Sequence, residues 1–367
     1  MTNIFQPKSL IENRVVVAMS GGVDSSVAAA LLVEQGYDVI GMMMRLWSEP
    51  GIGANAPMNR CCTPDQMADA RRVADQLHIP FYVVDVQDYF RNTIVHFFID
   101  EHEQGRTPNP CIECNRQIRF TYLFNQALAL DANYLATGHY ARVVATADGL
   151  CQLHKAVDSH KDQSYVLHVL TQEHLAHVKF PVGDHTKDEV RQLARKFKLP
   201  VAAKSESQDL CFLGDGDYRR FLTEYSERVA VPGPIVDGNG RQLGQHNGLS
   251  FYTIGQRKGL GISTPEPVFV LEKDVAHNTL VVGSREALGQ RQLQARDVNW
   301  LSGQSPDQPI AAQVKIRYKA KGMAATVIAG ENGHAHIEFH EPVYGITPGQ
   351  GAVFYDADVC LGGGIIV

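Results

Sequence analysis

The sequence predicts a mixed α/β fold: a parallel sheet with helices on both faces, then a small central α+β domain, then an antiparallel β-barrel. In the first half, short apolar runs alternate with amphipathic helical segments, as happens when helices connect parallel strands. After about residue 213, short β-like runs separated by turns replace this alternation. A length of 367 residues suits two or three domains. We therefore expect domains at 1–213, 214–290 and 291–367.

Each element of the first half follows from its own local pattern. Strands are expected at the short apolar runs Arg14–Met19, Tyr37–Met44, Phe81–Val86 and Tyr134–Thr137. Helices are expected at the amphipathic segments Asp24–Glu34, Pro64–Leu77, Tyr89–Glu103 and Arg116–Leu130. Asp148-Gly149 predicts a hairpin turn. Thr186 and Glu189 form a capping box for a helix that ends near Lys198.

The second half has a different character. Asp217–Tyr225 predicts a short helix. From about Leu293, β-like segments alternate with turns, at Gln313–Lys319, Ala324–Ile328, His336–His340 and Ala352–Tyr355. This pattern is typical of a small antiparallel barrel or sandwich.

The composition excludes a mainly disordered chain, since 44% of the residues are apolar and 20% are charged. Met1–Ser20 contains no long apolar stretch, and no segment reaches the roughly 18 apolar residues that a membrane helix needs. We expect a soluble, cytoplasmic protein with no membrane partner. The cysteine count is seven, and an odd number indicates thiol, metal or catalytic roles rather than a disulfide framework.

The net charge of −6 argues, by itself, against a nucleic-acid partner. The cations are nevertheless clustered. Four of them alternate along one expected barrel strand and would share one of its faces: Lys315, Arg317, Lys319 and Lys321. Arg257-Lys258 in a glycine-rich loop, with Arg116 and Arg119, would add phosphate contacts. The alternative is a solvated outer strand face that binds nothing.

The strongest motif is Ser20-Gly21-Gly22-Val23-Asp24-Ser25-Ser26, between an expected strand and helix. Its glycines allow a sharp turn, and its N–H groups and helix N-terminus favour a bound phosphate. It is not a Walker A loop, since no Gly-Lys-Ser/Thr follows. The alternative is a tight turn with serine caps. Gly41–Met44 and Ala136–Tyr140 end neighbouring strands, where ligands bind in open α/β sheets.

Two cysteines are candidates for chemistry. Cys114 lies at the expected start of a helix, among arginines, which favours its thiolate. Cys211 would have to meet it in space. Cys111 and Cys114 form a C-x-x-C pair that could also be a zinc half-site, or an iron–sulfur site together with Cys211. Cys151 and Cys360 are expected to be small buried hydrophobes, and no role is assigned to Cys61 and Cys62.

The loop resembles the PP-loop of ATP pyrophosphatases, which split ATP between the α and β phosphates and leave an adenylate on the substrate. Taken with it, five further stretches make the chain similar to the tRNA-specific 2-thiouridylases, from about residue 14 to the end. These stretches are GRTPNPCIECN at 105–115, KDQSY at 161–165, GQRKGLG at 255–261, TPGQ at 347–350 and CLGGGIIV at 360–367. The resemblance implies an N-terminal PP-loop domain, like an adenine nucleotide alpha hydrolase, a central domain and a C-terminal β-barrel.

The resemblance also implies a reaction. ATP with Mg²⁺ would adenylate the C2 oxygen of the wobble uridine in a tRNA anticodon stem-loop, and a persulfide on Cys211 would then supply sulfur, with Cys114 as the partner nucleophile. The donor of sulfur would be a relay protein or a cysteine desulfurase. A disulfide between the two cysteines would remain. The target base would have to be flipped out of its stack.

By resemblance, the ATP contacts are Ala18, Met19, Ser20, Gly21, Gly22, Val23, Asp24, Ser25, Met44 and Gly138. The tRNA contacts implied in the same way are Asn109, Pro110, Cys111, His139, Lys161, Asp162, Gln163, Arg317, Tyr318 and Gln350, of which 109–111 would touch the target base.

One position departs from the family pattern, because many members have Asp where this chain has Cys111. Three cysteines, Cys111, Cys114 and Cys211, also resemble members proposed to carry a [4Fe–4S] cluster, so persulfide and cluster chemistry stay open. Two further alternatives are a PP-loop ligase that adenylates a small carboxylate and an RNA-binding module with an inactive loop.

Overall fold

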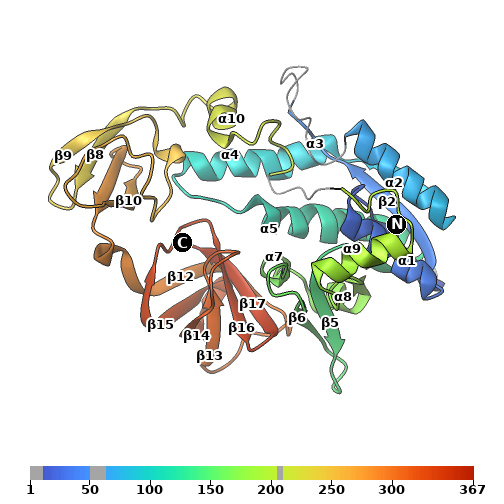
Figure 1. Ribbon diagram of the computed structural model, residues 1–367. Coiled ribbons are helices and arrows are strands. Elements are labelled where there is room, and N and C mark those ends of the chain that lie inside the picture. Colours follow the sequence, from blue (N-terminus) through green and yellow to red (C-terminus); the bar gives the residue numbers. More distant parts are fainter. Residues whose placement is uncertain (1–10, 50–62, 205–209) are drawn as a thin grey trace, which may run out of the picture. The chain divides into compact units, whose positions relative to one another are not determined.

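The computed structural model describes residues 11–49, 63–204 and 210–367 (Figure 1). Cys61 and Cys62 lie outside these residues. By internal contacts, the chain divides into two compact units. The first unit comprises the described residues of 1–91 and 113–216, and the second comprises 92–112 and 217–367.

A five-stranded parallel sheet forms the centre of the first unit, in the order β3-β2-β1-β4-β7. The strands are β1 (Ile11–Ala18), β2 (Asp38–Arg45), β3 (Phe81–Asp85), β4 (Ala132–Ala136) and β7 (Val178–Lys179). The four strands expected from the sequence are confirmed, and β7 is an additional edge strand. Val15, Val16 and Val17 of the central strand are fully buried, as an apolar run between neighbours on both sides should be.

Helices α1, α2, α6 and α8 contact strands of this sheet. The helices of this part of the chain are α1 (Val23–Glu34), α2 (Pro64–Leu77), α3 (Gln87–Phe90), α6 (Phe124–Ala129), α7 (Ser164–Leu167), α8 (Gln172–His177) and α9 (Lys187–Lys196). The capping box of Thr186 and Glu189 is present at the start of α9. α1 and α9 share one apolar core with the strands, which includes Val27 and Val190. The hairpin predicted at Asp148-Gly149 is also present, between β5 (Ala141–Ala145) and β6 (Cys151–Lys155).

The helix that carries the cysteines differs from the prediction. It begins at Pro110, not near Arg116, and runs through α5 (Pro110–Cys114), the π-helix η2 (Asn115–Leu123) and α6. Pro110 suits a first helical position, and the Asn109 side chain accepts a hydrogen bond from the Cys111 N–H. Cys114 therefore lies inside the helix rather than at its N-terminus. The upstream helix is also interrupted, by the π-helix η1 (Arg91–Val95) between α3 and α4 (His96–Glu103).

The second unit contains a four-stranded sheet in the order β10-β11-β8-β9. Its strands are β8 (Gly233–Asp237), β9 (Gln242–His246), β10 (Phe269–Asp274) and β11 (Thr279–Gly283). The short helix expected here is α10 (Tyr218–Tyr225), whose N-cap Asp217 accepts hydrogen bonds from two backbone N–H groups. The 3₁₀ turns η3 (Leu249–Phe251) and η4 (Glu286–Leu288) lie nearby in sequence.

Six antiparallel strands of the second unit form a closed barrel, because the last strand pairs with the first. They are β12 (Gly289–Trp300), β13 (Ile310–Lys315), β14 (Met323–Ala329), β15 (Ala335–Tyr344), β16 (Gly351–Asp356) and β17 (Val359–Ile366), with the 3₁₀ turn η5 (Glu331–Gly333) between β14 and β15. Alternate residues such as Val314, Val327 and Ile337 fill its interior. The barrel expected from the sequence is thereby confirmed.

One barrel expectation is wrong. β13 ends at Lys315, and residues 316–320 form bends and turns. The side chains of Lys315, Arg317, Lys319 and Lys321 therefore do not line one face of a strand. Alternation fixes a face only while the backbone stays extended. In the described part of the chain, no helix has both the length and the apolar character to cross a bilayer.

Candidate active site

The phosphate loop follows β1 and is shaped by close packing. Gly21 has φ 69°, and a Cβ placed there would lie 2.2 Å from the carbonyl oxygen of Gln66. Glycine is therefore required both by the backbone conformation and by the approach of α2. The Ser25 hydroxyl accepts a hydrogen bond from the Ser20 N–H at 3.2 Å, and the Ser26 hydroxyl donates to the Gly22 carbonyl at 2.7 Å. These serines hold the turn at the N-terminus of α1.

Asp24, the second residue of α1, is held by two groups that are distant in sequence. Its Oδ1 accepts hydrogen bonds from Lys187 Nζ at 2.6 Å and from the Tyr140 hydroxyl at 2.8 Å. Lys187 is the first residue of α9, and its side chain is only 11% exposed. The sequence marks the start of α9 through its capping box but gives no signal that this lysine reaches the loop.

A second lysine closes the other side of the loop. Lys204 Nζ donates to the Gly21 carbonyl at 3.0 Å and to Asp69 Oδ2 at 2.7 Å. Burial raises the pKa of the Asp69 carboxyl, but hydrogen bonds and charge interactions with Lys204 and, to a smaller extent, Arg72 outweigh burial and leave the pKa below its usual value. The loop is thus flanked by two ammonium groups, which suits a site for an anion.

Gly138 lies directly against the loop. A Cβ at this position would be 2.6 Å from the Ser25 backbone nitrogen and 2.8 Å from the Asp24 carbonyl carbon. The sequence expectation that Gly138 belongs with the phosphate loop is therefore matched in position. Met44 is the last residue but one of β2, which pairs with β1 through Ala18 and Met42. The residues expected to bind ATP thus gather at the carboxyl ends of adjacent strands.

The Cys114 thiol is buried and contacts the guanidinium of an arginine. Arg119 Nη1 donates a hydrogen bond to Cys114 Sγ at 3.2 Å and another to Asn115 Oδ1 at 3.3 Å. Asn115 is itself buried and donates to the Val166 carbonyl at 2.9 Å. A guanidinium in contact with sulfur favours the thiolate over the thiol.

His139 connects the two parts of the site. It follows Gly138, its Nδ1 shares a 2.7 Å hydrogen bond with the Thr137 hydroxyl, and its ring centroid lies 6.2 Å from that of Phe120. Burial, with a smaller effect of Arg119, lowers the pKa of His139 to about 3. The imidazole is therefore neutral at pH 7. Contacts run from Ser25 through this histidine to the helix of Cys114.

The other cysteines are placed as follows. The described cysteines differ in exposure: Cys111 is exposed, Cys151 and Cys211 are half-buried, and Cys360 is buried like Cys114. Next to Cys211, the Phe212 ring lies 6.2 Å from that of Phe90. Among the described residues, no three His, Cys, Asp or Glu side chains lie close enough to hold a metal ion.

Some residues expected to contact tRNA make hydrogen bonds inside the first unit. Asp162 is buried and accepts hydrogen bonds from the Ala156 N–H and from Ser164. Gln163 exchanges hydrogen bonds with the backbone of Tyr140 at 2.9 and 2.8 Å. Lys161 is half-buried. Asp162 and Gln163 thus support the strand end that carries Gly138.

In the second unit, Arg317 is anchored at one nitrogen. Its Nη2 donates to the carbonyls of Ile254 and Gly345, at 3.3 and 2.5 Å, and to the Thr347 hydroxyl at 3.2 Å. Gln350 Nε2 donates to the Thr107 carbonyl at 2.8 Å, which ties TPGQ to the segment that leads into Asn109 and Pro110. Tyr318 is half-buried, in the turn after β13.

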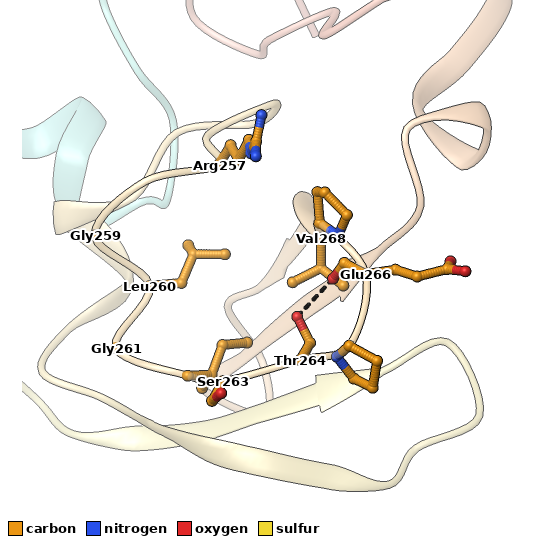
Figure 2. Close-up of a pocket in the computed structure, with 11 residues that line it drawn as sticks. Arg257, Gly259, Leu260, Gly261, Ser263, Thr264, Glu266 and Val268 are labelled. Atoms are coloured by element: carbon orange, nitrogen blue, oxygen red, sulfur yellow. Dashed lines mark hydrogen bonds between the residues drawn. The ribbon is translucent and has the colours of Figure 1, made fainter.

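The GQRKGLG segment forms an open loop around a cavity of about 400 Å³ (Figure 2). Arg257 lines it at one end, and Thr264 closes the other through a 2.7 Å hydrogen bond from its hydroxyl to the Glu266 carbonyl. Arg257 and Lys258 are both exposed. The loop therefore presents two cations to solvent.

Comparison with known proteins gives consistent matches. Residues 13–215 match the family described as tRNA methyl transferase HUP domain, residues 219–284 its PRC-barrel domain, and residues 290–366 the aminomethyltransferase beta-barrel domain. The chain is 50% identical over 356 residues to the tRNA-specific 2-thiouridylase MnmA of Magnetococcus marinus, covering 96% of this chain and 99% of that protein. It is 48% identical to the Symbiobacterium thermophilum protein of the same name, covering 97% and 92%.

Among solved structures, a 4-thiouridine synthetase–RNA complex with bound ATP is similar at a TM-score of 0.36 and 15% identity, over 58% of this chain and 50% of that one. The U34-tRNA thiolase NcsA of Methanococcus maripaludis, with its [4Fe-4S] cluster, is similar at a TM-score of 0.35 and 21% identity, over 60% and 66%. The similarity to the curated relatives extends over nearly the whole length of both chains. The chain therefore belongs to the tRNA-specific 2-thiouridylase family.

Proposed function

We propose that the chain replaces the C2 oxygen of the wobble uridine of tRNA with sulfur, at the expense of ATP. As a member of the 2-thiouridylase family it is a tRNA-uridine sulfurtransferase. One observation supports this chemistry most directly. A phosphate loop and a thiol paired with a guanidinium belong to one compact unit, and Gly138, His139 and Phe120 connect them by contact.

The first step activates the base. The loop residues from Ser20 to Ser25 would hold the phosphates of ATP, with their N–H groups and hydroxyls as donors. Mg²⁺ would enter with the nucleotide as part of the substrate. The uridine C2 oxygen attacks the α-phosphorus, and pyrophosphate leaves. The oxygen then departs as AMP in the next step, which makes C2 open to a sulfur nucleophile.

The second step transfers sulfur. The terminal sulfur of a Cys211 persulfide attacks C2 and displaces AMP. The Cys114 thiolate then attacks Sγ of Cys211, breaks the sulfur–sulfur bond and releases the 2-thiouridine. The two cysteine sulfurs supply the two electrons that reduce the transferred sulfur, so they end as a disulfide. A cellular thiol reductant must reopen it, and a persulfide-carrying protein must reload Cys211.

RNA binding would use the cations that the structure leaves at the surface. Arg257, Lys258, Lys319 and Lys321 are exposed, whereas Arg317 is anchored among backbone carbonyls. We propose phosphate contacts for the exposed four and a direct role for Asn109–Cys111 at the flipped base. We place the reaction in the cytoplasm, where tRNA and ATP are both available.

The thiolation of unmodified tRNA transcript tests the proposal. Anaerobically purified protein is incubated with ATP, a sulfide or persulfide donor and tRNA, and 2-thiouridine is measured by mass spectrometry after nuclease digestion. We expect thiolation that depends on ATP and produces AMP. Absence of 2-thiouridine, or ATP cleavage that depends on a small carboxylate instead of tRNA, would contradict the proposal.

Single cysteine variants separate the two mechanisms. Cys114→Ser and Cys211→Ser should each abolish thiolation, while Cys151→Ser, a half-buried cysteine on β6, serves as the matched control and should retain it. Cys111→Ser changes a residue proposed to contact the target base, so it should weaken thiolation without abolishing it. Loss of activity in Cys111→Ser together with loss of an iron chromophore would instead establish cluster chemistry.

A further inference from the structure

The π-helical winding of η2 determines which residue meets the Cys114 sulfur. Arg119 lies five positions after Cys114 and contacts it, with Nη1 at 3.2 Å from Sγ. In an α-helix, at 3.6 residues per turn, a separation of five residues places side chains about 140° apart around the axis. A π-helix bonds residue i to i+5, which brings those side chains onto one side. Residues 115–123 are π-helical.

We propose that Arg119 is a positioning residue that keeps Cys114 as the thiolate, and that the π-helical turn exists to deliver it. The inference rests on the proposed function only for the use made of the thiolate. The helix start at Pro110 makes such a partner necessary. The favourable effect of a helix N-terminus fades within the first turn, and Cys114 is the fifth residue of α5.

Other contacts fix Arg119 in this role. Its Nη1 also donates to the Asn115 side chain, and Asn115 is anchored in turn on the Val166 carbonyl. The second arginine of this helix is directed elsewhere, because Arg116 lies 3.6 Å from the carboxylate of Glu113. Arg119 therefore contacts the sulfur of Cys114, whereas Arg116 pairs with the carboxylate of Glu113.

Few other groups around this helix change their charge in the pH range in which Cys114 would ionise. Burial lowers the pKa of His139 to about 3 and that of His168 to about 4, and it also lowers the pKa of His174. These histidines come from the segment after β4, from the end of α7 and from α8. Glu113 and Arg116 compensate each other on the helix itself. Between pH 6 and 9 the Cys114 thiol is thus expected to titrate against the fixed charge of Arg119.

The test measures the alkylation of individual cysteines by iodoacetamide between pH 5.5 and 9.5, with peptide mass spectrometry to separate Cys114 from Cys111 and Cys211. It requires neither ATP nor tRNA. In the unaltered protein we expect the midpoint for Cys114 to lie well below about 8.5, the value of an ordinary thiol, and below that of Cys151 in the same sample. A midpoint at or above 8.5 overturns the proposal without any variant.

Variants then assign the effect to Arg119. Arg119→Gln should raise the midpoint by about one pH unit or more, Arg119→Lys should raise it less, and Arg116→Gln, the matched control, should leave it unchanged. An unchanged midpoint in Arg119→Gln, or an equal rise in Arg116→Gln, overturns the proposal.

Thiolation kinetics give a second readout. At pH 7 the single-turnover rate of Arg119→Gln should fall about tenfold, and at pH 9, where the thiol ionises unaided, most of that loss should disappear. A loss that is the same at both pH values would mean that Arg119 binds RNA or supports the fold, and overturns the proposal. A shifted alkylation midpoint in a protein that never thiolates tRNA would instead refute the proposed function alone.

Discussion

Lys187 donates a 2.6 Å hydrogen bond from Nζ to Oδ1 of Asp24, across 163 residues of sequence. The contact joins the first residue of α9 to the start of α1, where the phosphates of ATP would lie. Because Tyr140 donates to the same oxygen, the carboxylate is held on two sides. A phosphate held by this loop would lie beside the ammonium group, which would then stabilise the charge of the leaving pyrophosphate.

Replacing this lysine should weaken the use of ATP. Lys187→Met is expected to lower kcat/KM for ATP in tRNA-dependent AMP formation by about tenfold or more, which corresponds to about 1.4 kcal/mol. Lys196→Met is the control, since Lys196 belongs to the same helix and its exposed ammonium pairs with Glu34. Equal kinetics for the two variants would show that Lys187 only supports the fold.

Gly138→Ala should distort the phosphate loop, because Gly138 packs directly against Ser25. The new methyl carbon would lie 2.6 Å from the Ser25 nitrogen, so the strand end or the loop must move. We expect ATP binding, measured by calorimetry, to fall at least tenfold. Gly238→Ala meets no atom within 4 Å and should bind ATP normally. Unchanged ATP affinity in Gly138→Ala would place the nucleotide away from this loop.

The barrel cations should divide into two classes. Arg317→Met removes three hydrogen bonds and leaves carbonyls with fewer donors, so it should destabilise the protein by about 1–3 kcal/mol in urea unfolding. Lys319→Ala and Lys321→Ala should leave stability unchanged, but each should weaken tRNA binding and reduce the salt dependence of log K by about one unit. If Arg317→Met weakened tRNA binding without loss of stability, and the two lysine variants did not weaken binding, Arg317 would be the principal RNA contact.

Acid should destabilise the protein through its buried histidines. Burial, with a smaller effect of Lys273, lowers the pKa of His102 to about 3, and its Nδ1 has no hydrogen-bond partner among the described residues. Below pH 6.5 the unfolded chain binds a proton there that the folded chain does not. The stability present above pH 6.5 is therefore lost as the pH falls toward 3.

The size of this loss can be measured. Moving from pH 6.5 to 5.5 should cost about 1 kcal/mol for this one histidine, and urea unfolding at the two pH values should show it. His102→Leu should make the pH slope shallower by that amount. His160→Leu, an exposed histidine, should keep the slope of the unaltered protein. The same slope in both variants would mean that His102 is protonated in the folded state.

Local patterns were sufficient for much of the fold. The strands around the phosphate loop, the helix at Pro64–Leu77 and the capping box at Thr186 all follow from period, burial and end signals within a few residues. The phosphate loop follows in the same way, since its glycines and serines all lie between Ser20 and Ser26. These features depend on neighbours in the chain, so the chain by itself determines them.

The structure departs from the local pattern at two places, where local signals compete with packing. Pro110 and Asn109 start the cysteine helix earlier than its amphipathic pattern suggests, and the alternating cations after Lys315 lie in a turn. Both cases show that a pattern fixes a face only within the element that the backbone forms.

The tertiary structure alone decided the surroundings of the reactive groups. Lys187 and Lys204 reach the phosphate loop from far along the chain, at sequence separations of 163 and 183 residues, and no local pattern marks such contacts. The pairing of Arg119 with Cys114 depends on a π-helical turn that the sequence period does not distinguish from an α-helix. The sequence therefore determined which chemical groups the protein carries, and folding decided which charges they face, because electrostatic stabilisation depends on distances of a few ångströms.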